Sequence, residues 1–276
     1  MGGEAGRTRG GTGRGEMRWY RLNLEYDGTA FHGWAKQPGQ RTVEGEMEQA
    51  LATLLRHPAR LRVAGRTDRG VHASGQVASF ASASHVDLRR LQLGLNAVLP
   101  EDVAVRAVNE APAGFDARAA SARTYRYRVR LSPARPALDR LVVWHVHERL
   151  DAGVLKAAAA PFVGCRDWSA LTPSAASYHN CVREVRAASW HCAPPPASAL
   201  RTMLRASQPQ GQDWVFEVAA DSFLHMMVRV MVGSMVDAAA GRLTVEDLRA
   251  GITSGERRRM GRTAPACGLC LIAVEY

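Results

Sequence analysis

One segment of the chain, residues 124–131, alternates strictly between two kinds of side chain. Four of its residues are aromatic or apolar, namely Tyr125, Tyr127, Val129 and Leu131. The other four are polar and mostly basic, namely Thr124, Arg126, Arg128 and Arg130. Because successive side chains of a β-strand point to opposite faces, this alternation predicts a strand with one aromatic, apolar face and one basic face.

The first half of the chain combines further strand patterns with helices. Strands are predicted for residues 18–26, 61–64, 76–80 and 103–108. Apolar residues recur at helical spacing in residues 43–54 and 88–98, and Thr42 and Asp87 are suited to cap these two helices. Pro100 ends the second helix.

The pattern begins again after Pro133 and Pro136. Strands are predicted for residues 141–147, 182–190, 200–205, 214–220 and 269–276, with a stiff proline-rich loop at 193–198. Helices are predicted for residues 151–162, 223–240 and 245–253. The order of elements predicts an α+β fold in two related halves, residues 18–135 and 136–276, after a disordered basic tail at residues 1–17.

Composition narrows the class of partner. A net charge of +10 and a pI near 10.0 favour a polyanion such as RNA. No secretory signal or membrane segment is predicted, because the most apolar run, residues 223–240, carries His225, Arg229 and Asp237 and suits a core helix. Five cysteines in 276 residues form no even disulfide framework, so we expect a cytoplasmic protein.

The sequence predicts neither a metal nor a nucleotide cofactor. Cys267 and Cys270 have C-x-x-C spacing, but no second pair of zinc ligands accompanies them. His145 and His147 share one face of a predicted strand and lack a third ligand. No phosphate-binding loop of the G-x-x-x-x-G-K-[ST] type is present, which weakens a kinase or ATPase interpretation.

The segment VAGRTDRGVHASGQVASF, residues 63–80, carries the strongest chemical signal. It places Asp68 between Arg66 and Arg69 in a glycine-rich turn. A carboxylate with an ordinary pKa of about 4 is ionised at neutral pH, and flanking guanidinium groups would keep it ionised in a half-buried pocket. The alternative is a surface turn in which Asp68 only neutralises its neighbours.

The string GRTDRGVHA, followed by GQV, resembles the signature of the tRNA pseudouridine synthase A (TruA) family. Further blocks resemble the family in the same order: EYDGTAFHGW, RTVEGEMEQAL, LGLNAVLPEDVAV, FDAR, RTYRYRV, FLHMMVRVMVG and TAPACGLCLIAVEY. The resemblance spans nearly the whole chain. It implies a pseudouridine synthase fold, in which two related α/β-sandwich halves join through a central antiparallel sheet with a basic cleft.

The resemblance also implies an activity. The expected reaction is isomerisation of uridine to pseudouridine at positions 38, 39 and 40 of the tRNA anticodon stem-loop, without a cofactor. A homodimer is implied, in which one tRNA contacts both subunits. Asp68 matches the family's catalytic aspartate, a nucleophile whose adduct, at the sugar or at C6 of the base, or whose part in an elimination, is left open.

Two more residues match catalytic positions of the family. Tyr125 would stack on the uracil and is a candidate base for the C5 proton, although a strand tyrosine without the motif would be assigned to core packing. Arg229 lies in an otherwise apolar helix, so its charge must reach solvent or meet a carboxylate. The resemblance supplies Asp68 as that carboxylate, with His225 in a supporting role.

The substrate-binding set is completed by three residues of the signature, Arg66, Arg69 and His72. A uridine in a stem must be flipped out to react, and Arg66 is a candidate to fill the space that it leaves. The chain departs from the family at two positions. Ala35 replaces the usual glutamine after GW and Arg69 replaces an alanine, which affects the expected RNA contacts but not the reaction class.

Two other classes of protein are weighed against this hypothesis. A non-catalytic RNA-binding protein would have no need to keep Asp68, Tyr125 and Arg229 together. A metal-dependent nuclease would require clustered carboxylates to hold magnesium, and the sequence shows no such cluster.

Overall fold

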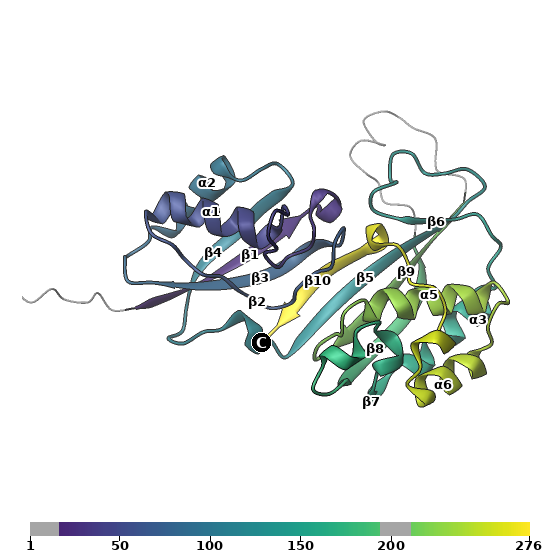
Figure 1. The fold of residues 1–276 in the computed structure, drawn as a ribbon. Helices are drawn as coiled ribbons and strands as arrows, with labels where there is room; N and C mark the ends of the chain where they lie inside the picture. The colour runs from purple at the N-terminus through teal and green to yellow at the C-terminus, as the bar shows by residue number, and fades with distance from the viewer. Residues whose placement is uncertain (1–16, 194–210) are drawn as a thin grey trace, which may run out of the picture.

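The computed structural model describes residues 17–193 and 211–276. Within these residues, ten strands form one mixed sheet with the order β4-β1-β3-β10-β5-β9-β8-β7, and β2 pairs with β3 and β6 with β5 (Figure 1). The strands are β1 (Arg18–Tyr26), β2 (Arg62–Val63), β3 (His72–Ser82), β4 (Val103–Ala111), β5 (Ala122–Leu131), β6 (Trp144–Val146), β7 (Gly164–Asp167), β8 (Val182–Ala193), β9 (Gln212–Ala220) and β10 (Leu269–Glu275). The tail before Met17, nearly all of the predicted loop at 193–198 and the predicted strand at 200–205 fall outside the described residues.

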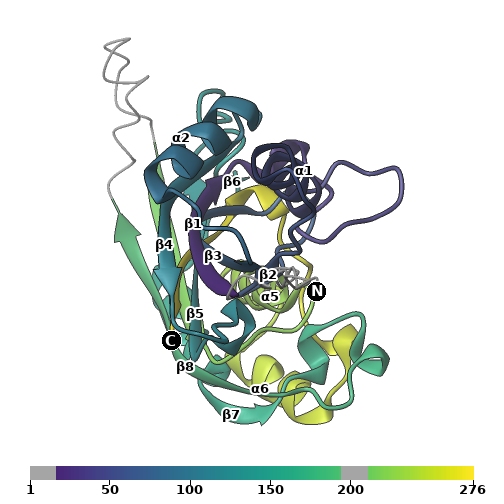
Figure 2. The same ribbon diagram turned by 90° about the vertical axis from the view of Figure 1, so that its left-hand side faces the viewer.

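The helices gather in two groups beside the sheet (Figure 1). One group lies near β1 and β4 and consists of α1 (Val43–Leu55) and α2 (Leu88–Val98). The other lies near β8 and β9 and consists of α3 (Ala152–Ala157), α5 (Met227–Ala239) and α6 (Val245–Ser254). Figure 2 shows α1, α5 and α6 on the same side of the sheet.

Short 3₁₀ turns connect the larger elements. They are η1 (Gly28–Ala30), η2 (Ala117–Ala119), η3 (Ala160–Phe162), η4 (Ser169–Leu171), η5 (Ala175–Ser177), η6 (Arg257–Arg259) and η7 (Ala266–Gly268). The helix predicted for residues 151–162 is thus divided between α3 and η3. In the same way, the strand predicted for residues 141–147 is reduced to β6.

The predicted helix caps are confirmed. The Thr42 side chain accepts a hydrogen bond from the backbone N–H of Gly45 at 3.3 Å, and that of Asp87 accepts one from Arg90 at 2.9 Å. The helix expected over 223–240 begins later, at Met227, because Met226 takes a left-handed conformation with φ of 61°. Residues 223–226 therefore form a short segment that leads into α5.

The centre of the sheet differs from the antiparallel arrangement that we expected. β10, the last strand of the chain, lies between β3 and β5 and runs parallel to β3. It is antiparallel to β5, and the short β6 is parallel to β5. The strands β3 and β10 are far apart in the sequence, so no hairpin fixes their relative direction.

The alternation of β5 is confirmed, but its polar face is not a free basic surface. Tyr127 and Val129 are buried as predicted. On the other face, β9 supplies carboxylates: Arg126 pairs with Glu217 at 2.6 Å, and Arg128 and Arg130 both pair with Asp213. Arg130 is itself buried and also pairs with Asp139. The sequence of β5 alone could not reveal this compensation, because it depends on which strand lies beside it.

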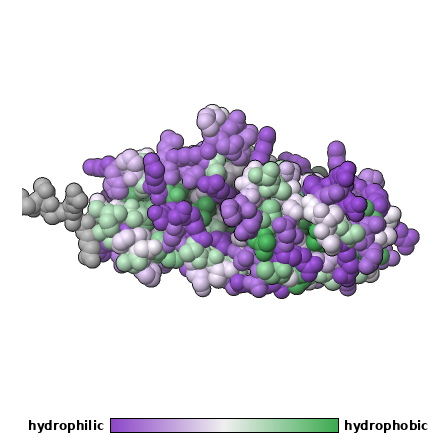
Figure 3. Space-filling view, turned by 60° about the horizontal axis from the view of Figure 1, so that its bottom comes forward, coloured by the Kyte–Doolittle hydropathy of each residue, from purple (hydrophilic) through white to green (hydrophobic). Residues whose placement is uncertain are grey.

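The face of the molecule drawn in Figure 3 is mainly polar. In the space-filling view of Figure 3, hydrophilic side chains cover much of the face that is shown, and apolar residues are scattered among them in small groups. No helix in the described part of the chain is long and apolar enough to cross a membrane.

Candidate active site

A cavity of about 610 Å³ contains Asp68 and is lined by residues from distant parts of the chain. One side is formed by the Asp68 loop, which we define as residues 64–71. Another side is formed by residues 222–228, which end in the first two residues of α5. The arginines in the lining are Arg62, Arg66, Arg118 and Arg123, whereas the acidic residues are Glu44 and Asp68. The lining is therefore net basic.

The predicted contact between Asp68 and Arg229 is confirmed. Nη1 of Arg229 lies 3.7 Å from Oδ2 of Asp68, and Nε2 of His225 lies 3.8 Å from Oδ1. Both distances are longer than a direct hydrogen bond. Among the described residues, the Asp68 carboxylate receives no hydrogen bond, and its side chain is 20% exposed. Because no hydrogen bond from the described residues occupies its oxygens, the carboxylate is available to react with a ligand in the cavity.

Arg229 and His225, the two neighbours of the Asp68 carboxylate, are fixed by their own hydrogen bonds. Nε of Arg229 donates to the carbonyl of Ala264 at 2.8 Å. The backbone N–H of His225 donates to the Tyr178 hydroxyl at 2.8 Å, and Nδ1 of His225 lies 3.1 Å from the hydroxyl of Ser174. Met226 follows His225 and has a left-handed backbone conformation, and α5, which carries Arg229, begins at the next residue.

Tyr125 lines the same cavity, as predicted. Its ring meets that of Phe223 edge to face, with centroids 5.1 Å apart. A Cβ on Gly65 would lie 3.7 Å from the Tyr125 hydroxyl oxygen, so the tyrosine reaches the Asp68 loop. Burial raises the pKa of Tyr125 well above its usual value, with smaller contributions from Tyr26 and from the charge of Asp68. The phenol is therefore protonated at neutral pH.

A buried polar network beneath the Asp68 loop was missed by the sequence analysis. The Tyr26 hydroxyl lies 2.8 Å from the hydroxyl of Thr67. Nε2 of Gln76 donates to the carbonyl of Gly65 at 2.7 Å and to the Tyr26 hydroxyl at 3.2 Å. The backbone N–H of Trp34 donates to the carbonyl of Thr67 at 3.0 Å. The signal was present, since Gln76 is an amide beside the apolar residues Val77, Ala78 and Phe80 of the predicted strand.

Arg123 is a second support that was missed. It is buried, and within the described residues its guanidinium donates only to backbone carbonyls, those of Ala64, Arg118, Ala120 and Asp221. Burial lowers the pKa of this guanidinium. Ala64 begins the Asp68 loop and Asp221 precedes the segment 222–228, so Arg123 joins both sides of the cavity.

The structure does not bring together all of the predicted substrate-binding residues. Arg66 lines the cavity and is exposed, whereas Arg69 is exposed and outside the lining. Neither forms an ion pair with Asp68 among the described residues, so the predicted flanking by these guanidinium groups is wrong.

His72 is also placed outside this cavity. It lies at the start of β3, where Nδ1 accepts a hydrogen bond from Gly28 N–H at 3.1 Å and Nε2 lies 2.8 Å from the carbonyl of Leu141. Its ring is buried and lines a separate cavity of about 440 Å³. The structure shows His72 as a support of the turn at Gly28.

No group of three or more histidine, cysteine, aspartate or glutamate side chains suited to a metal ion occurs among residues 17–193 and 211–276. Sγ of Cys267 lies near the carbonyl of Val143, and that of Cys270 near the hydroxyl of Ser74.

Comparison with known proteins identifies the class and then the family. A family model described as tRNA pseudouridine synthase matches residues 24–118 and 158–276, which places the chain among the pseudouridine synthases, a class of intramolecular isomerases. Both matched segments lie in the sheet and cavity described above, and they include Asp68 and Arg229. Tyr125 falls between them.

Full-length relatives agree. A tRNA pseudouridine synthase A of Geotalea uraniireducens is 37% identical over 262 residues, which is 94% of this chain and 100% of the relative. Proteins of the same name from Pelobacter propionicus and Methylobacterium nodulans are 38% and 40% identical over 269 residues, again 94% of this chain and 100% and 96% of the relatives. The chain belongs to the tRNA pseudouridine synthase A (TruA) family.

Proposed function

We propose that this protein converts uridine to pseudouridine at positions 38, 39 and 40 of the tRNA anticodon stem-loop, with Asp68 as the nucleophile and with no cofactor. The observation that carries the proposal is the Asp68 carboxylate, which lies in the cavity beside Arg229 and His225 without a hydrogen bond from the described residues. A volume of about 610 Å³ lies within the usual range of ligand sites, roughly 300–1,000 Å³. The names of the relatives support tRNA as the substrate.

The reaction needs no external reactant. The bond between ribose C1′ and uracil N1 breaks, the uracil rotates, and C1′ bonds to C5. The proton of C5 is lost and N1 is protonated, so the product is an isomer of the substrate. Asp68 supplies the electron pair that assists the first step, and the Arg229 guanidinium lies 3.7 Å from its carboxylate.

The cavity accepts a base only after it leaves the helix stack, which costs a few kcal/mol. We propose that Tyr125 stacks on the flipped uracil, with its ring held by Phe223. Because burial raises the pKa of Tyr125, the hydroxyl carries its proton at neutral pH, and this favours stacking over removal of the C5 proton in the free enzyme. Arg66, exposed at the cavity, is proposed to fill the space vacated by the base.

Two further parts of the proposal rest on the family resemblance. We propose a homodimer in which one tRNA contacts both subunits, with Arg69, exposed outside the cavity, as an RNA contact. A cytoplasmic location also stays a prediction.

Tritium release tests the proposed reaction. The purified protein is incubated with a tRNA transcript that carries tritium at uracil C5, and the modified positions are then mapped. We expect release to solvent that resists a metal chelator, and pseudouridine at positions 38–40. A transcript with cytidine at these three positions is the control. Tight binding without release would identify a non-catalytic RNA-binding protein, and chain cleavage that stops with chelator would identify a nuclease.

A further inference from the structure

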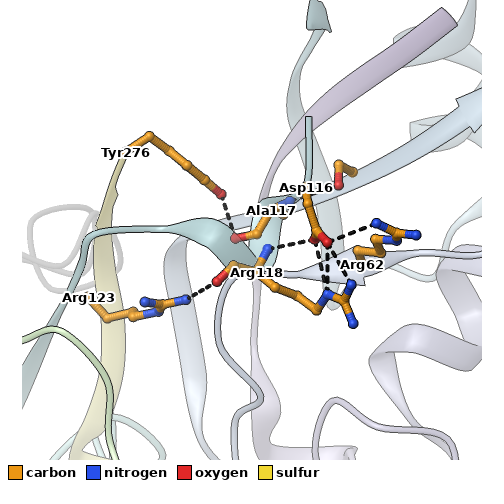
Figure 4. Close-up of polar contacts among 7 residues, drawn as sticks. Arg62, Asp116, Ala117, Arg118, Arg123 and Tyr276 are labelled. Atoms are coloured by element: carbon orange, nitrogen blue, oxygen red, sulfur yellow. Dashed lines mark hydrogen bonds and ion pairs between the residues drawn. The ribbon is translucent and has the colours of Figure 1, made fainter. Parts of the chain in front are cut away.

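Asp116 holds two arginines at the rim of the Asp68 cavity (Figure 4). Its carboxylate accepts hydrogen bonds from Nε and Nη2 of Arg118 at 3.0 and 2.7 Å. Nη1 of Arg62 donates to the same carboxylate at 2.8 Å. Asp116 also caps η2 by accepting from the backbone N–H of Arg118 at 3.0 Å. One carboxylate therefore fixes two guanidinium groups that line the same cavity.

The backbone beneath these arginines is anchored from three directions. The N–H of Ala117 donates to the hydroxyl of Ser79 at 3.0 Å, and the Tyr276 hydroxyl donates to the carbonyl of Ala117 at 3.0 Å. Nη2 of Arg123 donates to the carbonyl of Arg118 at 3.0 Å (Figure 4). Arg123 also bonds the start of the Asp68 loop, so the arginine pair is tied to the position of Asp68.

The two arginines keep donors free for a ligand. The side chain of Asp116 is 19% exposed, whereas those of Arg62 and Arg118 are 56% and 65% exposed. Among the described residues, Nη1 of Arg118 and Nε and Nη2 of Arg62 have no hydrogen-bond partner. The bonds from Arg118 and Arg62 hold the pKa of Asp116 at about 2, so the carboxylate is ionised and the group of three carries one net positive charge.

An ion pair on an open surface contributes little to stability, so stability does not explain why two arginines share one carboxylate here. We propose that Arg62 and Arg118 together bind one phosphodiester group of the RNA backbone beside the flipped nucleotide, and that Asp116 is a positioning residue that aims them. Guanidinium groups recognise phosphate with paired donors, and contacts to phosphate set the register of a protein on a nucleic acid. This inference rests on the proposed function, because it takes RNA as the ligand of the cavity.

The test is a double-mutant cycle in which one change is made in the protein and the other neutralises a single phosphate of the RNA. An anticodon stem-loop RNA is made in versions that each carry one neutral methylphosphonate linkage near position 39. Wild-type protein and Arg118→Gln are titrated with every version. We expect one linkage whose neutralisation weakens wild-type binding about tenfold and Arg118→Gln binding less than about twofold. Additive effects at every linkage would overturn the proposal.

Salt dependence and a matched arginine complete the test. Arg118→Gln should lower the log–log slope of affinity against salt by about one. The control is Arg106→Gln, since Arg106 is 62% exposed, pairs with Glu25 and does not line this cavity. It should leave the methylphosphonate profile unchanged. An equal change of the profile in the control would contradict the assignment.

The variant Asp116→Asn distinguishes the positioning of Arg62 and Arg118 by Asp116 from the effect of the Asp116 charge on RNA binding. Removal of the carboxylate adds one net positive charge, so charge alone predicts tighter binding of the RNA. If Asp116 aims the arginines, Asp116→Asn binds more weakly than wild type and loses sensitivity to the same linkage. Tighter binding with the profile retained would reject the positioning role. These titrations measure binding, whereas tritium release by wild type tests the proposed reaction, so the two proposals fail separately.

Discussion

Gln76 and Arg123 are buried residues that donate to neighbouring backbone carbonyls of the Asp68 loop. Gln76 bonds the carbonyl of Gly65, and Arg123 bonds that of Ala64. Buried polar groups are costly when unpaired, so each of these bonds constrains the loop strongly. The carboxylate of Asp68 is the contrasting group, because its partners lie at 3.7 and 3.8 Å. The loop is thus held through its backbone, and its reactive side chain is left available.

The first prediction concerns the pair of Arg229 and Asp68. Arg229→Ala leaves a largely buried carboxylate without its nearest cation and removes the bond to Ala264. We expect a loss of about 1–3 kcal/mol in the free energy of unfolding, below the cost of breaking a fully buried pair because Asp68 is partly exposed. In the Asp68→Asn background the loss should be smaller by about 0.5 kcal/mol or more. Urea unfolding of the four proteins measures this difference.

A distant arginine provides the control for that cycle. Arg249 on α6 is exposed beside Glu246, so Arg249→Ala and Asp68→Asn should be additive within about 0.5 kcal/mol. Strict additivity of Arg229→Ala and Asp68→Asn as well would show that the pair does not contribute to stability. Arg229→Lys keeps the charge but not the planar geometry, so it should restore turnover only in part.

At the scale of elements, α5 is positioned by its close contact with the segment before η7. A Cβ on Gly233 would overlap the carbonyl oxygen of Arg262. The same segment supplies the Ala264 carbonyl that Arg229 binds, and the N–H of Ala264 donates to the carbonyl of Arg229 at 2.9 Å. The absence of a side chain at Gly233 therefore decides how closely α5, and with it Arg229, approaches this segment.

The second prediction is that Gly233→Ala destabilises the protein and lowers turnover. In an exposed helix the change from glycine to alanine stabilises by up to about 1 kcal/mol. Here the overlap with backbone should reverse the sign, with a loss of about 1–3 kcal/mol. Thermal unfolding and tritium release measure the two effects. Gly153→Ala in α3 is the matched control, because Gly153 is exposed and nearest to a side-chain atom, and it should be neutral or stabilising. A stabilising Gly233→Ala would contradict the packing described here.

Local sequence patterns predicted the individual helices and strands better than the way in which the strands pair in the sheet. The caps at Thr42 and Asp87 and the alternation of β5 were readable, because they depend on neighbouring residues. The place of β10 beside β3 and the carboxylates of β9 opposite the β5 arginines were not, because they depend on pairing between distant strands. Within the site, the resemblance led to Asp68, Tyr125 and Arg229. The supports that hold their backbone are buried amide and guanidinium groups whose bonds become visible only in the fold.

At the scale of the whole molecule, one sheet joins the parts that form the cavity. β3 follows the Asp68 loop, β5 carries Tyr125, and β10 lies between them. The segment 222–228 follows β9 on the other side of β5. A change that opens the sheet at β10 would therefore separate Asp68 from Tyr125 and Arg229 together. For this reason we expect loss of turnover and loss of the folded sheet to coincide.

The third prediction is an alkaline loss of stability. Burial raises the pKa of Tyr26, Tyr125 and Tyr127 far above the usual value of about 10, and that of Tyr276 to about 12. Below pH 10 these phenols keep their protons in both the folded and the unfolded chain. As the pH rises above about 10, the unfolded chain loses protons that the folded chain retains, so the free energy of unfolding falls.

Urea unfolding between about pH 8 and 11, together with tyrosinate absorbance, checks this prediction. The folded protein should show clearly less tyrosinate than the unfolded chain at about pH 11. Tyr125→Phe should reduce the decline in stability, since it removes one of the groups responsible. Equal tyrosinate signals from folded and unfolded protein throughout this range would show that the four phenols are not protected.

The role of Asp68 is the central claim, and one variant tests it most directly. Asp68→Asn keeps the shape of the side chain and removes its charge, while four other residues of the cavity lining are arginines, and we propose that Arg62 and Arg118 among them contact phosphate. Tritium release from tRNA labelled at uracil C5 should fall by at least about a thousandfold, with tRNA affinity within about threefold of wild type. Turnover within about tenfold of wild type, in protein shown by mass spectrometry to retain asparagine, would contradict the assignment of Asp68 as the nucleophile.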